Sequence, residues 1–72
     1  MNNRCYFEYA TNKIYAVLDN GAIYRYNDYS QPIAFLDNNT WFAAKDFKPI
    51  AFEEQNSVFD YVTHQPLYYI SF

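Results

Sequence analysis

The stretch IAFEEQNSVFDYVTHQP, residues 50–66, contains the pattern that decides the fold. An apolar and aromatic segment runs into Gln55 and Asn56, and a second one begins at Val58 and Phe59. β-Branched and aromatic residues bounded by turn-forming residues are typical of β-strands. The stretch therefore predicts a tight hairpin, followed by a second turn that ends at Pro66.

The same unit recurs every 17 to 19 residues along the chain. Its first strand opens on an aliphatic residue in each copy, at Ile14, Ile33, Ile50 and Leu67. A proline directly precedes the last three of these positions. Because proline cannot donate a hydrogen bond to a sheet, each proline should lie at or just before the start of a strand. The chain thus reads as strand, tight turn, strand, turn, repeated.

The fourth copy is divided between the two ends of the chain. Residues 67–72 look like a first strand, and Tyr6 to Tyr9 look like a second strand. Complementary halves at opposite ends are what a closed ring requires, and closure removes exposed sheet edges. We therefore predict one all-β domain over residues 1–72: a closed pseudo-four-fold ring of short antiparallel hairpins, like a miniature propeller or barrel. Its units are about 14–32, 33–49, 50–66, and 67–72 joined with 1–13.

The whole chain resembles the four-fold β-flower family, in which short hairpins surround a pseudo-four-fold axis. The resemblance covers about residues 5–72 and depends on three segments, residues 24–35, 42–52 and 59–69. The family tends to have glycine after the aliphatic residue that opens each strand, where this chain has Tyr15, Ala34, Ala51 and Tyr68. The resemblance implies the architecture, and it brings no known activity or catalytic residues.

Alternation along the strands sorts their residues into two faces. The first face is apolar or aromatic throughout, and we predict that it forms the core, with a ring of packed aromatic side chains. The second face is mixed, and it comprises Tyr15, Val17, Ala34, Leu36, Ala51, Glu53, Tyr68, Ile70, Tyr6, Glu8, Ile23, Arg25, Trp41, Ala43, Val58 and Asp60. It either forms an apolar contact surface for a partner or is buried where neighbouring hairpins pack. The first face comprises Ile14, Ala16, Ile33, Phe35, Ile50, Phe52, Leu67, Tyr69, Phe7, Tyr9, Tyr24, Tyr26, Phe42, Ala44, Phe59 and Tyr61. The predicted ring of packed aromatic side chains consists of Phe7, Tyr24, Phe42 and Phe59.

The composition narrows the function classes. Nine Tyr, seven Phe and one Trp supply much of the apolar area that so small a domain needs. A net charge of −3 with scattered basic residues disfavours nucleic acid. Cys5 is the single cysteine, so no intrachain disulfide forms, and we expect it to be a small buried hydrophobe. Neither a signal peptide nor a membrane helix is visible, so we expect a cytoplasmic protein without a membrane partner.

No residues match a catalytic, cofactor-binding or metal-binding pattern, so we expect neither an enzyme nor a cofactor. His64 lies in a turn with no nucleophile indicated nearby, and we expect it to be solvated. Glu8, Glu53 and Asp60 could come together on the second face opposite Arg25. We expect them to form surface ion pairs, and a divalent cation only if they converge.

The aromatic excess favours a small interaction or assembly module, one that self-associates through the second face or the rim, or binds another protein. Tyr15, Trp41 and Tyr68 are the candidate interaction surface. The alternative is a small-ligand domain, with a sugar-like ligand among the options, whose axis is lined at one end by Tyr9, Tyr26 and Tyr61. Exposure of Trp41 would distinguish the two.

Overall fold

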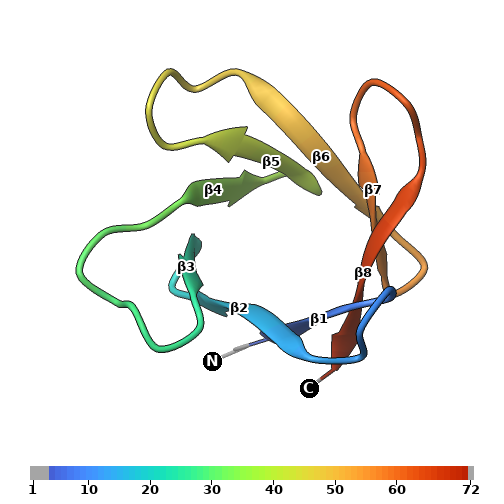
Figure 1. Cartoon of the computed structure of the whole chain (residues 1–72). Helices are drawn as coiled ribbons and strands as arrows, with labels where there is room; N and C mark the ends of the chain where they lie inside the picture. Colours follow the sequence, from blue (N-terminus) through green and yellow to red (C-terminus); the bar gives the residue numbers. More distant parts are fainter. Residues whose placement is uncertain (1–3, 72) are drawn as a thin grey trace.

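Eight β-strands and no helix form the residues that the computed structural model describes, 4–71 (Figure 1). The predicted all-β class is confirmed. The strands are β1 (Arg4–Glu8), β2 (Ile14–Asp19), β3 (Ala22–Arg25), β4 (Ala34–Asp37), β5 (Thr40–Ala43), β6 (Pro49–Glu54), β7 (Ser57–Asp60) and β8 (Pro66–Ser71). Two of the three prolines open a strand, as expected.

The strands close into a barrel. Each one pairs antiparallel with the next in the sequence, and β1 pairs with β8. That closing pair runs from Cys5 opposite Ser71 to Glu8 opposite Tyr68. Figure 1 shows β1 and β8 side by side, completing the ring. The predicted closed ring of hairpins, with the two ends of the chain completing one unit, is confirmed.

Each tight hairpin within a unit has two successive residues with positive φ. This is the signature of a type I′ turn, whose twist matches that of the flanking strands. Asparagine and glycine tolerate this conformation best. The pairs are Asn20 (57°) with Gly21 (86°), Asn38 (54°) with Asn39 (68°), and Gln55 (52°) with Asn56 (66°).

Two substitutions test these turns in opposite directions. Gly21→Ala should lower the free energy of unfolding by about 1–2 kcal/mol because alanine resists positive φ. A steric clash contributes nothing, since a Cβ at this position meets no atom within 4 Å. Asn39→Gly creates the Asn-Gly pair of the first hairpin and should raise stability by about 0.5 kcal/mol. Urea denaturation measures both changes, and equal effects of the same sign would contradict the assignment.

The turns between units share a second design. In three of them a residue with positive φ donates its backbone N–H back to the end of the preceding strand: Asn12 to Glu8, Phe47 to Ala43, and His64 to Asp60. The connection between β3 and β4 is longer. These two strands consequently pair through only two residue pairs, Ala22 with Phe35 and Ile23 with Ala34. The β3–β4 seam is the least regular part of the barrel.

Bulges interrupt the pairing at three equivalent places. The register shifts by one residue in β1–β2, β5–β6 and β7–β8, and this leaves Tyr15, Ile50 and Leu67 without a residue opposite them. A bulge breaks the strict alternation of side chains and aims one of them in a new direction. These residues lie next to Ala16, Ala51 and Tyr68, which point into the barrel.

The interior is built from side chains of the second face. Ile23, Trp41, Val58 and Tyr6 are at most 2% exposed and lie across the hairpins or the closing pair from Leu18, Leu36, Glu53 and Ile70. A third set of equivalent positions holds Ala16, Ala34, Ala51 and Tyr68, of which the three alanines are buried. Small side chains predominate here because four strands converge on the axis and leave little room.

The sequence-based prediction of the core face was therefore wrong, although Ala16 is correctly placed. Its aromatic ring, Phe7, Tyr24, Phe42 and Phe59, is only half-buried. Aromatic side chains of this face pair on the outside of the barrel, with centroid distances of 5.3 Å between Phe7 and Tyr69 and 5.4 Å between Phe52 and Phe59. A tight barrel holds few large side chains, so most aromatic residues lie outside and shield the strands from water.

A candidate binding pocket on the barrel axis

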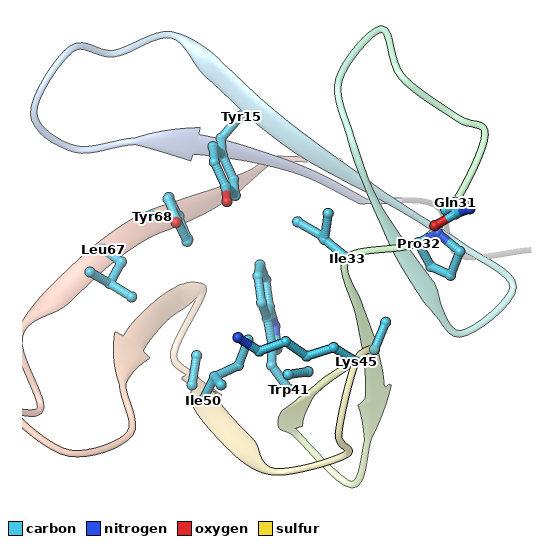
Figure 2. A pocket seen from close by; sticks show the side chains of 12 residues that line it. Tyr15, Gln31, Pro32, Ile33, Trp41, Lys45, Ile50, Leu67 and Tyr68 are labelled. Atoms are coloured by element: carbon cyan, nitrogen blue, oxygen red, sulfur yellow. The ribbon is translucent and has the colours of Figure 1, made fainter.

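One end of the barrel opens into a pocket of about 560 Å³ (Figure 2). Its walls come from the starts of the first strands and the ends of the second strands. The lining residues are Tyr15, Gln31, Pro32, Ile33, Trp41, Ala43, Ala44, Lys45, Ile50, Ala51, Leu67 and Tyr68. The volume lies within the range of about 300–1,000 Å³ that small-molecule sites occupy.

The bulges create the rim of this pocket. Strict alternation would point Tyr15, Ile50 and Leu67 outward, because their neighbours point inward. Instead all three line the pocket, and Figure 2 shows them converging on it together with Ile33. Ile33 directly precedes β4 and occupies the equivalent position in its unit. The pseudo-four-fold repeat thus places one large side chain from every unit around a single opening.

A column of aromatic rings descends from the rim to the barrel interior. The Arg25 guanidinium lies 4.5 Å from the centre of the Tyr15 ring, which stacks on Tyr68 at 4.5 Å. Tyr68 in turn stacks on Trp41 at 5.8 Å. The Trp41 ring meets Tyr6 edge-on at 4.9 Å. Such contacts add about 0.5–1.5 kcal/mol each beyond burial, so this wall of the pocket is held rigidly.

The hydroxyl group of Tyr68 lies in this aromatic wall. Burial, and then the neighbouring Tyr15 hydroxyl, raise the pKa of Tyr68 above its ordinary value. Glu8 adds to this increase, and Arg25 opposes it. The Tyr68 hydroxyl therefore remains protonated at neutral pH and is able to donate a hydrogen bond.

Beneath the pocket, a buried carboxylate anchors the aromatic column. Glu53 is 8% exposed, and its Oε2 accepts hydrogen bonds from the Tyr6 hydroxyl at 2.6 Å and from Trp41 Nε1 at 2.8 Å. Its Oε1 pairs with the guanidinium of Arg4. Burial, and then the hydrogen bond to Glu53, raise the pKa of Tyr6, so this phenol also stays protonated. The network fixes the orientation of Trp41.

The structure brings the candidate interaction residues together, but in a pocket. Tyr15, Trp41 and Tyr68 form consecutive members of the aromatic column and all line the cavity. Trp41 is 2% exposed, which excludes it from an outer contact surface. The reason is that the second face points into the barrel. The sequence places these three residues together on an exposed contact surface, whereas in the structure they lie together on the inner side of the sheet.

The candidate axial tyrosines do not line this pocket. Tyr9, Tyr26 and Tyr61 are 45–50% exposed and follow directly after β1, β3 and β7. Tyr9 shows the reason. It lies two residues after Phe7, so its side chain also points to the outside of the barrel. There it packs on the Tyr69 ring at 5.3 Å and shares a hydrogen bond with the Ser57 hydroxyl. The sequence-based prediction did not include the lining residues Ile33, Ile50, Leu67 and Lys45. A proline directly precedes each of the first three, and this recurring pattern could have indicated that they occupy equivalent positions.

The predicted cluster of acidic residues does not form. Glu53 pairs with Arg4 instead of Arg25, and Glu8 accepts a hydrogen bond from the Thr11 hydroxyl at 2.6 Å. Within residues 4–71, no group of three or more His, Cys, Asp or Glu side chains is arranged to hold a metal ion. His64 is exposed, with its ring 5.4 Å from that of Phe52. Cys5 is a free thiol, half-buried rather than buried.

Asp60 shapes its own turn. Its carboxylate accepts hydrogen bonds from the backbone N–H groups of Val62 and Thr63, both at 2.9 Å. The bond from Thr63, and then that from Val62, lower the pKa of Asp60. A carboxyl group with a lowered pKa stabilises the fold above its unfolded-state pKa of about 4 and loses this effect as the pH falls through the folded-state value.

The pH dependence of Asp60→Asn tests this local role. Wild-type protein should lose more stability between about pH 5 and pH 2 than the variant, whose amide still accepts hydrogen bonds but does not titrate. Urea denaturation at several pH values measures the difference. Asp37→Asn, at the end of β4, is the matched control. Parallel curves for wild type and Asp60→Asn would show that the turn contributes nothing through its charge.

Comparisons of the chain with known protein families, with curated proteins and with solved structures found no match. Among residues 4–71, no helix is long and apolar enough to span a membrane. The geometry of the pocket is therefore the basis for assigning a function.

Proposed function

We propose that this chain is a small non-enzymatic binding module that receives a small, largely apolar molecule in its axial pocket. The observation that carries the proposal is the pocket itself: about 560 Å³, open at one end of the barrel, with one large side chain from each of the four units around it. We retain the assignment to the four-fold β-flower family as part of the proposal.

The lining favours an apolar ligand over a sugar. Seven of the twelve residues are alanine, isoleucine, leucine or proline. The polar groups are few: the hydroxyls of Tyr15 and Tyr68, the Gln31 amide and the Lys45 ammonium. Apolar walls with a small number of polar groups are the usual make-up of small-molecule sites. A sugar would leave many of its hydroxyl groups unpaired against such walls.

Trp41 provides the measurement, because it is the only tryptophan and lines the pocket. Titration with 4-phenylbutan-1-ol should change its fluorescence saturably, with a dissociation constant at or below about 1 mM. Ile50→Phe enlarges a rim side chain that is 41% exposed and should weaken binding at least about tenfold. Val62→Phe adds a ring at a turn position that is 82% exposed and outside the lining, and should bind like wild type. The absence of saturable binding would refute the proposal.

Self-association is a second candidate, favoured by the exposed residues of the turns. Phe47 and Val62 are 66% and 82% exposed. Phe47 also adopts a positive φ of 60°, a conformation costly for phenylalanine and occupied by Asn12 and His64 in the equivalent turns. The Phe47 ring stacks on Phe35 at 5.7 Å, and its exposed part is the proposed contact between copies at the rim. Most of the second face is internal and excluded from this role. Light scattering should show association that Phe47→Asn reduces, and a strict monomer at high concentration would eliminate this candidate.

A further inference from the structure

We infer that the axial pocket selects apolar molecules that carry one carboxylate. The inference rests on the proposed binding function and specifies the chemistry of the ligand. It follows from the distribution of charge around the opening, where the only charged side chain in the lining is a lysine.

Lys45 lies in the turn after β5, two residues beyond the end of the strand at Ala43, and lines the pocket. Figure 2 shows its side chain running across the opening in this view, with the ammonium group directed toward the middle. The single salt bridge among residues 4–71 joins Arg4 and Glu53, so no carboxylate of this part of the chain neutralises Lys45. An ammonium group at the mouth of an apolar pocket attracts an anion attached to an apolar body.

The groups around Lys45 reinforce this preference. Tyr15 and Tyr68 supply phenol hydroxyls in the lining, and these groups are able to donate hydrogen bonds to a carboxylate. Arg25, over the outer face of the Tyr15 ring, adds a second positive charge near the opening. Glu8 is close enough to raise the pKa of Tyr68, but it does not line the pocket and accepts a hydrogen bond from Thr11. Among residues 4–71, no acidic residue belongs to the lining.

The geometry also fixes how the ligand would lie. The aliphatic rim residues Ile33, Ile50 and Leu67 and the aromatic column below them line the way in, so the apolar part enters first. The carboxylate then stays at the opening, partly hydrated and next to Lys45. This arrangement avoids the large cost of burying an unpaired charge. A ligand with a cationic end would meet Lys45 with the wrong sign.

Three probes with one apolar group separate charge preference from pocket binding: 4-phenylbutyrate, 4-phenylbutan-1-ol and 4-phenylbutylamine. Trp41 fluorescence should give the affinity order carboxylate, alcohol, amine. Lys45→Met should weaken carboxylate binding about fivefold and leave the alcohol unchanged, as expected for the loss of one solvent-exposed ion pair. Lys48→Met removes an exposed lysine of the same turn that is outside the lining, and should change neither affinity. Lys45→Glu should reverse the order, so that the amine binds with higher affinity than the carboxylate.

The outcomes distinguish the two levels of the argument. Equal binding of carboxylate and alcohol, unaffected by Lys45→Met, would overturn the charge preference and leave the proposed pocket function intact. A higher affinity for the amine in wild-type protein would also overturn the preference. Failure of all three probes to bind would refute the proposed function itself. An equal loss in Lys45→Met and Lys48→Met would indicate general electrostatics rather than a contact with Lys45.

Discussion

Glu53→Leu should lower the free energy of unfolding by about 3–5 kcal/mol, although leucine is the residue at two of the three equivalent positions, Leu18 and Leu36. The substitution removes the acceptor for the Tyr6 hydroxyl and for Trp41 Nε1, and it leaves the Arg4 guanidinium without its carboxylate. A buried donor without an acceptor costs about 1–3 kcal/mol. Small domains have total stabilities near the lower end of about 5–15 kcal/mol, so the variant should be close to unfolding at room temperature.

A double-mutant cycle shows whether this loss comes from the network. Tyr6→Phe should cost about 1–2 kcal/mol in wild-type protein and nothing in the Glu53→Leu background, where the hydroxyl has already lost its acceptor. Glu53→Gln keeps an amide oxygen as acceptor and provides a folded reference if Glu53→Leu does not fold. Urea denaturation gives all the values. If Tyr6→Phe cost the same in wild type and in the Glu53→Leu background, the two residues would not be coupled and the anchoring role of Glu53 would be wrong.

Deletion of residues 67–72 should abolish the cooperative unfolding transition of the whole domain. The strand that is lost, β8, pairs with both β1 and β7, so its removal opens the barrel and creates two bare edges. It also removes Tyr68 and Ile70, which pack against the core. A linear array of hairpins would only fray at one end. Circular dichroism during heating should show no sigmoidal transition for the truncated chain.

A circular permutant is the matched control for the deletion. A short linker that joins the ends of the chain, with new ends placed in the β3–β4 connection, keeps every strand pair because Cys5 and Ser71 lie opposite each other. The new ends fall in an exposed loop, where such openings are tolerated. The permutant should retain a cooperative transition. A truncated chain that melts like the full chain, or a permutant that fails to fold, would contradict closure through β1 and β8.

The architecture was accessible from the sequence because it is encoded locally and repeatedly. Turn residues such as Asn20 with Gly21 recur at a fixed period, and prolines mark where first strands begin. The division of one unit between the chain ends left closure as the way to satisfy its edges. These features depend on backbone conformation, which short stretches of sequence specify well.

The inner face was not accessible in the same way. Alternation defines two faces but not which one points inward, and total hydrophobicity favoured the wrong one. The deciding factor is the small radius of the barrel, which admits Ala34 and Ala51 near the axis and leaves no room there for a ring of three phenylalanines and a tyrosine. The recurrence of alanine after the aliphatic residue was the relevant pattern. The sequence predicts Glu53 to be a surface acid. Its burial is explained by Arg4, Tyr6 and Trp41, which bind its carboxylate inside the barrel.

The pocket depends on the bulges, which sequence alternation does not reveal. Proline at the start of β6 and β8 is compatible with a bulge because it has no N–H to contribute to the ladder. The residue after each proline, Ile50 or Leu67, is then free to turn toward the axis. The repeat thus produces a ring of side chains around one opening, and Lys45 gives this ring a charge.

Isotope-filtered nuclear Overhauser spectroscopy with 4-phenylbutyrate tests the central claim most directly, because it locates the bound molecule on the barrel. The account predicts contacts from the phenyl protons to the methyl groups of Ile33, Ile50 and Leu67 and to the Trp41 indole. Contacts to Val17 or Val62 on the outside of the barrel, with none to the pocket, would contradict it.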